Sequence, residues 1–404
     1  MKKETNNIKQ FNNKKKENLS AEFNKKRADH QMNKLMIILG TALGIIVVIV
    51  ALILIIRFVF MGKQYESVEV INETEFFIST GSEVKRFKDG FIVCNSDGIK
   101  YVNTKGEQIW NEAFMMQKPL TDIGNNMVAV ADYNGTSIHI MDDKSVLGKI
   151  DTGMPVRKFK TCDNGYVMAV LDNTGNTPIY VYNTEGREML YFNTTMKGYG
   201  YPLEIAISDN GILGAVSYLN VDKGSFYTTL AFYNFGEVGQ NYQDSLISNY
   251  TYQSALVPEV NFAGNSHAVA IADNRVMFFD GEQIPQNNGD ILLKSELKSV
   301  YEDDEYVALF YLSDDSTHAY MAEIYDYDGK LKDTVYFDID YNDVYFHEGR
   351  MILYNNSEVM IHVLGGVDKY VGNLEDTILT LIPTAKPQRF VLVTNNEIKT
   401  IEFE

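Results

Sequence analysis

Three short motifs in the sequence have the residue types of a serine acyl-transfer site. Residues 82–85 (SEVK) and 295–298 (SELK) match S-x-x-K, and residues 208–210 (SDN) match S-D-N, as in penicillin-binding proteins. That chemistry needs a helix, which places the lysine one turn from the nucleophilic serine. Residues 82–85 instead fall in a strand-turn region, residues 208–210 precede a turn glycine, and no K-T-G occurs. The sequence therefore predicts no acyl-transfer enzyme.

A second candidate site lies in an acidic stretch, residues 301–343, which holds 13 Asp/Glu against two lysines. Within it a D-x-D-x-N-D pattern brings oxygen ligands of the kind that Ca²⁺ prefers. The pattern is not an EF-hand, because its sixth position is not glycine and its twelfth is Gly349. A solvated acidic rim is the alternative that we favour. The candidate Ca²⁺ ligands are Asp338, Asp340, Asn342 and Asp343.

Other familiar chemistries lack their residues. The six histidines are scattered, without an H-E-x-x-H pair, and no P-loop pattern occurs. The two cysteines, Cys94 and Cys162, fall in non-adjacent repeats and are expected to be free thiols. We therefore predict a non-catalytic protein with no cofactor and no catalytic residues.

Charge is divided unevenly along the chain. Residues 1–34 hold ten Lys/Arg and four Asp/Glu, a net +6, whereas residues 57–404 hold 26 and 50, a net −24. The first segment is rich in Lys and Asn and poor in apolar residues, which predicts a disordered basic tail. The acidic remainder would be repelled by nucleic acid, so we expect no nucleic-acid partner.

An uncharged segment, residues 35–56 (LMIILGTALGIIVVIVALILII), separates these two parts. As a helix it would extend about 33 Å, enough to cross a hydrocarbon core of about 30 Å. It is longer than the apolar region of a signal peptide and lacks a small-x-small cleavage site. We predict a single transmembrane helix in contact with membrane lipid.

The flanking charges give this helix a direction. Residues 15–34 contain six Lys/Arg, whereas the 20 residues after the helix contain two. The excess predicts a cytoplasmic tail at 1–34, a short linker at 57–64 and an extracytoplasmic domain at 65–404. Gly40 and Gly44 form a G-x-x-x-G pattern, which can let two such helices pack as a homodimer.

From residue 65 onward the sequence repeats. Runs of β-branched and aromatic residues alternate with Asn/Asp/Gly turns, as in hairpins. One type of apolar run, seen at 91–94 (FIVC) and 268–272 (AVAIA), recurs eight times about every 43 residues. We predict an all-β fold, a β-propeller of eight four-stranded blades, with seven as the alternative. The last repeat lacks an outer strand, which residues 67–76 (SVEVINETEF) can supply to close the ring.

Residues 90–110 (GFIVCNSDGIKYVNTKGEQIW) resemble one repeat of the quinoprotein-like (PQQ-type) propellers, with a strand, a DG turn, a second strand and a G-x-x-x-W strand. The whole chain resembles a family of membrane-anchored bacterial β-propellers without a known activity. Quinoprotein dehydrogenases repeat the tryptophan, and many stack the cofactor under a disulfide of adjacent cysteines. This chain has one tryptophan, Trp110, and no adjacent cysteines. The resemblance therefore implies a propeller scaffold of the bacterial envelope and no quinone.

The widest interval between repeats, residues 211–267, is expected to carry an extra loop. Tyrosine is enriched in binding surfaces, although strands also favour it. We predict a partner-contact patch formed by Tyr218, Tyr227, Tyr233, Tyr242, Tyr250 and Tyr252.

These observations predict a single-pass, membrane-anchored, extracytoplasmic propeller that serves as a protein-interaction scaffold for an envelope protein. Two alternatives stay open. One is a sensor that binds a small ligand or a glycan in the central funnel. The other is a hydrolase that uses paired carboxylates.

Overall fold

The computed structural model describes residues 36, 41, 43–50, 64–192 and 200–404. The chain divides into two compact units, Met1–Lys63 and Gln64–Glu404. In the first unit residues 43–50 are helical and exposed, and a Cβ added to Gly44 would meet no atom within 4 Å. Among the residues that the structure describes, no helix combines the length and the apolar character needed to cross a membrane. The predicted tail, Gly40 and most of the predicted span and linker lie outside these residues.

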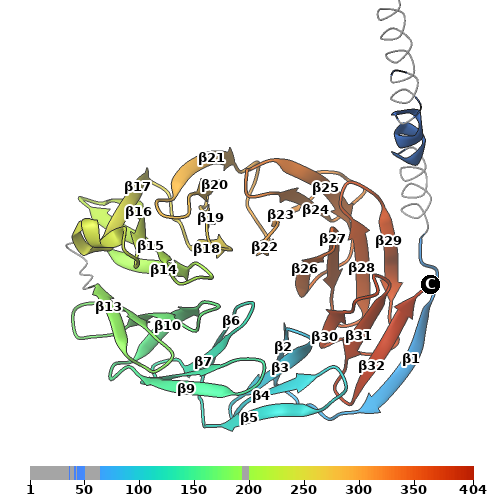
Figure 1. Ribbon diagram of the computed structural model, residues 1–404, viewed down its shortest axis with the longest axis horizontal. Helices are drawn as coiled ribbons and strands as arrows, with labels where there is room; N and C mark the ends of the chain where they lie inside the picture. The colour runs from blue at the N-terminus through green and yellow to red at the C-terminus, as the bar shows by residue number, and fades with distance from the viewer. Residues whose placement is uncertain (1–35, 37–40, 42, 51–63, 193–199) are drawn as a thin grey trace, which may run out of the picture. The chain divides into compact units, whose positions relative to one another are not determined.

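The second unit is a closed ring of eight antiparallel sheets, each with four strands (Figure 1). Seven blades consist of four consecutive strands: β2–β5, β6–β9, β10–β13, β14–β17, β18–β21, β22–β25 and β26–β29, which are blades 1 to 7. Blade 8 combines β30, β31 and β32 with β1. The prediction of eight four-stranded blades is confirmed.

Strands occupy equivalent positions in each blade, from the centre of the ring to its rim (Figure 1). The innermost strands are β2 (Glu83–Phe87), β6 (Pro119–Ile123), β10 (Val156–Thr161), β14 (Tyr201–Ile207), β18 (Glu259–Ala263), β22 (Ser299–Glu302), β26 (Asp343–His347) and β30 (Thr380–Pro383). The second strands are β3 (Gly90–Asn95), β7 (Val128–Asp132), β11 (Val167–Leu171), β15 (Leu213–Asp222), β19 (His267–Ile271), β23 (Val307–Leu312), β27 (Arg350–Tyr354) and β31 (Arg389–Val393). The third strands are β4 (Gly98–Asn103), β8 (Ser137–Met141), β12 (Ile179–Tyr182), β16 (Ser225–Asn234), β20 (Arg275–Asp280), β24 (Tyr320–Tyr325), β28 (Glu358–Val363) and β32 (Glu397–Phe403). The outermost strands are β5 (Gln108–Ala113), β9 (Val146–Asp151), β13 (Glu188–Phe192), β17 (Leu246–Gln253), β21 (Gln286–Leu292), β25 (Leu331–Phe337), β29 (Asp368–Asn373) and β1 (Val68–Glu75), and two short 3₁₀ helices, η1 (Gly239–Asn241) and η2 (Gln243–Ser245), precede β17.

The second strands show why these sequences form blades. Successive side chains of a strand point to opposite faces of its sheet. In β7, Val128 and Val130 pack in a cluster with blade 1, whereas Ala129 and Ala131 pack in a cluster with blade 3. All four are fully buried. Both faces of this strand are therefore apolar, which explains its continuous apolar run.

The core of the propeller lies between its blades. Within the described part of the ring, eight apolar clusters each combine buried residues of two neighbouring blades. Two of these clusters place blade 8 between blades 7 and 1. Each blade therefore depends on both of its neighbours to cover its two faces.

The ring closes through strands from opposite ends of the propeller. Strand β1 runs antiparallel to β32, with Val68 opposite Phe403 and Glu75 opposite Glu397. Figure 1 shows β1 on the rim beside β32. The prediction that residues 67–76 supply the missing outer strand is confirmed.

The closing blade provides a stability test. Phe403 is buried and packs 4.6 Å, centroid to centroid, from the ring of Tyr370 in blade 7. We expect Phe403→Ala to lower the free energy of unfolding by about 3–5 kcal/mol, because it leaves a cavity in this interface. Urea unfolding measures the change, and Val70→Ala, at a half-exposed position of β1, should cost under about 0.5 kcal/mol. Equal losses in the two variants would contradict the proposed role of the blade 7–blade 8 interface.

Candidate functional site

The innermost strands surround a central channel. A cavity of about 830 Å³ is lined by residues from seven of these strands, β2, β6, β10, β14, β18, β22 and β26, and from the turns that follow them. A second cavity of about 460 Å³ shares Arg86 and Ile123 with it and is lined by Glu83, Asn342 and Asp343 among others. Both volumes fall in the range of small-molecule binding sites.

The larger cavity is acidic. Its cationic side chains are Arg86, Lys88 and Lys160. Against these three it has seven carboxylates, so the lining carries four more acidic than basic groups. The carboxylates are those of Asp122, Asp209, Glu302, Asp303, Asp304, Glu305 and Glu348.

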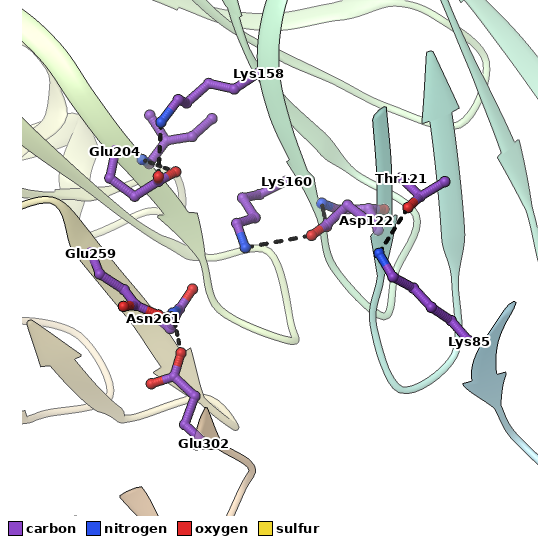
Figure 2. Close-up of polar contacts among 11 residues, drawn as sticks. Lys85, Thr121, Asp122, Lys158, Lys160, Glu204, Glu259, Asn261 and Glu302 are labelled. Carbon is purple, nitrogen blue, oxygen red and sulfur yellow. Dashed lines mark hydrogen bonds and ion pairs between the residues drawn. The ribbon is translucent and has the colours of Figure 1, made fainter. Parts of the chain in front are cut away.

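Polar contacts join neighbouring innermost strands around this channel (Figure 2). The Lys85 ammonium of β2 donates to the Thr121 hydroxyl of β6 at 3.1 Å. The Asp122 carboxylate of β6 then accepts the backbone N–H of Thr161 at 2.6 Å and lies 3.5 Å from the Lys160 ammonium of β10. These contacts hold the first three blades in register at the centre of the ring.

The same pattern continues around the channel. Lys158 of β10 pairs with Glu204 of β14 at 2.7 Å. Arg86 of β2 pairs with Asp343 of β26 at 2.5 Å, although β30 lies between these strands in the ring, and its guanidinium stacks 3.8 Å from the centroid of Tyr345. Arg86 thereby connects blades 1 and 7 across blade 8.

Two carboxylates meet on the opposite side of the channel. The Asn261 amide of β18 donates to Glu259 at 3.4 Å and to Glu302 of β22. Figure 2 shows both carboxylates beside this amide, on the side of the channel that faces Lys160. Burial, reinforced by the charge of Glu259, raises the pKa of Glu302 to about 8. Burial also raises the pKa of Glu259, although the nearby positive charge of Lys160 acts to lower it.

A second carboxylate pair lies where β14 and β22 end. The Asn125 amide donates to Asp304 at 3.0 Å and to Asp209 at 3.4 Å. Burial, reinforced by the charges of Asp163 and Asp304, raises the pKa of Asp209 to about 6. Each pair therefore consists of two carboxylates from different elements held by one asparagine.

The candidate Ca²⁺ ligands take separate partners. Asp338 accepts the backbone N–H of Ala319 at 2.8 Å, and Asp340 accepts the Tyr320 hydroxyl. Asn342 donates to Asn356 at 2.9 Å, and Asp343 forms the ion pair with Arg86. Among the described residues, no group of three or more His, Cys, Asp or Glu side chains is arranged to hold a metal ion.

The predicted tyrosine patch is wrong for two of its members. Tyr218 of β15 and Tyr233 of β16 are 1% and 2% exposed and their hydroxyls lie 3.0 Å apart in the core. The wide interval between repeats is mainly two long strands, and these side chains lie on the face that packs against blade 3. Tyr227, Tyr250 and Tyr252 are half-buried, and Tyr242, between η1 and η2, is exposed. For these four the partner-contact role stays a prediction.

The same blade has a projecting hairpin. Strands β15 and β16 contain 10 residues each, whereas the second and third strands of the other blades contain four to seven. Four extra residues lengthen a strand by about 13 Å. Near the tip Val221 lies opposite Phe226, and Tyr201 of β14 lies opposite Leu219.

These positions share one face of the sheet, because directly paired residues and residues two apart point the same way. Val221 is 65% exposed, Tyr201 42% and Phe226 37%. We call Tyr201, Val221 and Phe226 the hairpin patch. It is an exposed apolar surface on an element longer than its equivalents.

The S-x-x-K and S-D-N motifs do not form a site. Ser82 is half-buried, Ser295 is exposed, and Lys85 lies in strand β2. Ser208 is buried in a turn, where its hydroxyl oxygen accepts the backbone N–H of Leu213 at 2.9 Å. The serines and lysines are thus structural or solvent-facing.

Sequence reasoning missed the channel residues. Glu302 and Lys160 each lie at or near the end of an innermost strand, a few residues before the apolar run that marks each repeat. A charged residue at that place in several repeats could have indicated a polar channel. Which charges meet depends on the blade order, which no local motif encodes.

A model of a family of unknown function, DUF5711, matches residues 61–403. The chain belongs to this family. A comparison with curated proteins found no match. Among solved structures, apo AztD of Citrobacter koseri is similar with 10% identity and a TM-score of 0.50, over 73% of this chain and 87% of that one. BamB of Moraxella catarrhalis is 10% identical, with a TM-score of 0.49, over 83% of this chain and all of that one. At this identity the likeness to AztD shows the propeller fold alone.

The buried carboxylate Glu302 gives a pH test. Between its ordinary pKa of 4.5 and about 8, the folded protein holds a proton that the unfolded chain has released, so stability falls as pH rises through this window. We expect Glu302→Gln to raise the free energy of unfolding by about 1–3 kcal/mol at pH 9 and to change it little at pH 4.5. Urea unfolding across this range measures the profile. Glu83→Gln, which removes one charge from an exposed residue of β2, is the control. If Glu302→Gln raised the free energy of unfolding equally at every pH, the raised pKa of Glu302 would be contradicted.

Proposed function

We propose that this chain is a single-pass, membrane-anchored, extracytoplasmic propeller that acts as a non-catalytic scaffold for another envelope protein. The observation that carries the scaffold role is the hairpin patch on the projecting β15–β16 hairpin. A propeller is a rigid ring, and binding residues concentrate on the connecting segments that a rigid scaffold positions. This hairpin is such a segment.

The hairpin patch has the composition of a binding surface. Its three side chains are apolar or aromatic, and aromatic residues are enriched in the centres of interfaces. Covering Val221 and Phe226 would remove exposed apolar area at about 25 cal/mol per Å². Tyr252, half-buried on the same face, extends the patch toward the body of blade 4. A protein partner therefore has an apolar anchor point on an otherwise acidic domain.

The anchor and its direction rest on the sequence. The uncharged run at 35–56 is long enough to span a membrane, and the excess of Lys/Arg before it favours a cytoplasmic N-terminus. The propeller would then lie outside the membrane, where its partner would be another envelope protein.

A small-ligand function is a second candidate, which the channel cavity supports. Partner capture by Glu302→Gln separates the two, because a scaffold that binds through the hairpin does not depend on a channel carboxylate. Loss of capture in this variant with the fold intact would favour a role for the channel.

Site-specific photocrosslinking in cells tests the scaffold. A photoreactive amino acid at Val221 or Phe226 of the full-length protein should yield adducts with the same envelope protein, identified by mass spectrometry. The control position is Met115, which is 92% exposed on blade 1, and residues 1–64 alone are the anchor control. Phe226→Asp should reduce the Val221 adduct at least tenfold, because the charge would have to be desolvated. Identical adducts at all positions would refute the hairpin as the docking surface.

Cysteine labelling tests the orientation. Cys94 and Cys162 are buried free thiols, and burial raises the pKa of Cys94 to about 11, so both should resist maleimides. A cysteine introduced by Met115→Cys should react with a membrane-impermeant maleimide in intact cells. Labelling only after the membrane is permeabilised would place the propeller in the cytoplasm.

A further inference from the structure

The channel contains polar atoms that the protein leaves without partners. Among the described residues, three buried side-chain N or O atoms without a hydrogen-bond partner belong to residues that line the larger cavity. These are Oε2 of Glu302, the hydroxyl of Tyr345 and Nε2 of His347. A buried polar group without a hydrogen-bond partner destabilises the folded state. Their concentration in one cavity indicates a ligand that supplies the missing contacts.

The charges of the channel favour a cationic ligand. Among its basic groups, Arg86 pairs with Asp343, Lys160 lies 3.5 Å from Asp122, and Lys88 donates to Asn126. The hydrogen-bond partner of Glu302, in contrast, is the neutral amide of Asn261, and the charge of Lys160 affects Glu302 less than the charge of Glu259 does. The seven carboxylates of the lining therefore outnumber its three basic groups.

The positions of the two carboxylate pairs that asparagines hold indicate which kind of cation fits the channel. Glu302 belongs to the inner pair and Asp304 to the pair at the end of the strands. Two residues of fully extended chain span at most about 7 Å, which limits the distance between their Cα atoms. Glu302 and Asp304 are thus near neighbours along the chain, and a ligand with two ammonium groups joined by a short carbon chain can contact both.

The cavity also provides surface for that carbon chain. Its lining includes the rings of Phe262, Tyr306 and Phe346, and the last two lie 5.2 Å apart, centroid to centroid. Aromatic faces attract ammonium groups and cover methylene groups. A bare metal ion would need three or more converging ligands, which the described residues do not group together.

We propose that the central channel binds a short aliphatic diamine or polyamine, with one ammonium at Glu302 and a second at the Asp209–Asp304 pair. The carbon chain lies against the aromatic rings of the lining. This inference is independent of the hairpin patch and of the proposed scaffold role.

Binding of this kind releases a proton. The groups that face Glu302 are Glu259 of β18, Lys160 of β10, the adjacent Asp303 and the Tyr327 hydroxyl that follows β24. Because burial and Glu259 raise the pKa of Glu302 to about 8, much of this carboxyl is protonated at pH 7.5. An ammonium group favours the ionised form and displaces the proton.

Titration calorimetry of the full-length protein in detergent, with 1,4-diaminobutane at pH 7.5 and low salt, tests the proposal. We expect saturable binding at one site, with proton release that appears as a dependence of the heat on the ionisation enthalpy of the buffer. The uncharged analogue 1,4-butanediol should not bind. Glu302→Gln should weaken binding at least tenfold and abolish the proton release.

Two further variants make the result decisive. Asp304→Asn should also weaken binding at least tenfold, and it serves if Glu302→Gln fails to fold. Glu66→Gln removes one exposed carboxylate outside the channel and should leave the affinity within twofold. The proposal would be overturned if the wild type showed no saturable binding or if the diol bound equally well. Equal affinity in all variants would also overturn it, because that result would indicate attraction to the general negative charge of the protein.

Discussion

Burial of apolar surface between neighbouring blades is the interaction on which the rest of this structure depends. No blade has a core of its own in the described ring, since each apolar cluster draws its residues from two blades. A sheet that is apolar on both faces cannot end at an open side without exposing one of them to water. Ring closure therefore follows from the same alternation that builds each second strand, and β1 completes it by pairing with β32.

The centre of the ring obeys a different constraint. Eight strands that converge leave space that their side chains cannot fill with apolar groups, and the protein places charges there instead. Where partners from neighbouring blades meet, as Asp122 does with Lys160, desolvation is offset by hydrogen bonds and opposite charge. Glu302 stands apart because the charge that affects it most is that of another carboxylate, Glu259. The centre thus combines satisfied contacts, which stabilise the ring, with an unsatisfied group, which favours binding.

Much of the fold could be predicted from the sequence, because a repeated apolar run has a strict physical cause. The count of eight and the closing role of residues 67–76 both follow from the period and from the missing last strand. The site could not be predicted in the same way. The contact between Asn261 and the carboxylates of Glu259 and Glu302 forms only because blades 5 and 6 are neighbours in the ring. Their types and local spacing carry no sign of that contact.

Tyr218 and Tyr233 show a second limit of sequence reasoning. A tyrosine in a wide interval between repeats suggests a loop, but this interval is filled by the long strands β15 and β16. In these strands adjacent residues face two different neighbouring blades, so burial depends on how far a position lies from the hairpin tip, which composition alone cannot assign. The exposed members of this region, Val221 and Phe226, were distinguishable only once the pairing of the hairpin was known.

The pairing of β1 with β32 joins a strand that is synthesised early to one that is synthesised last. Glu75 of β1 leaves the ribosome roughly 320 residues before its partner Glu397, which at 5–20 residues per second is a delay on the order of 15–60 s. Throughout that delay β1 is a strand without a partner, and such edges invite pairing with other chains. Its Glu69, Glu73 and Glu75 repel similar strands during the wait. The acidic character of β1 can therefore be understood as protection for a nascent chain whose last step of folding is to close its ring.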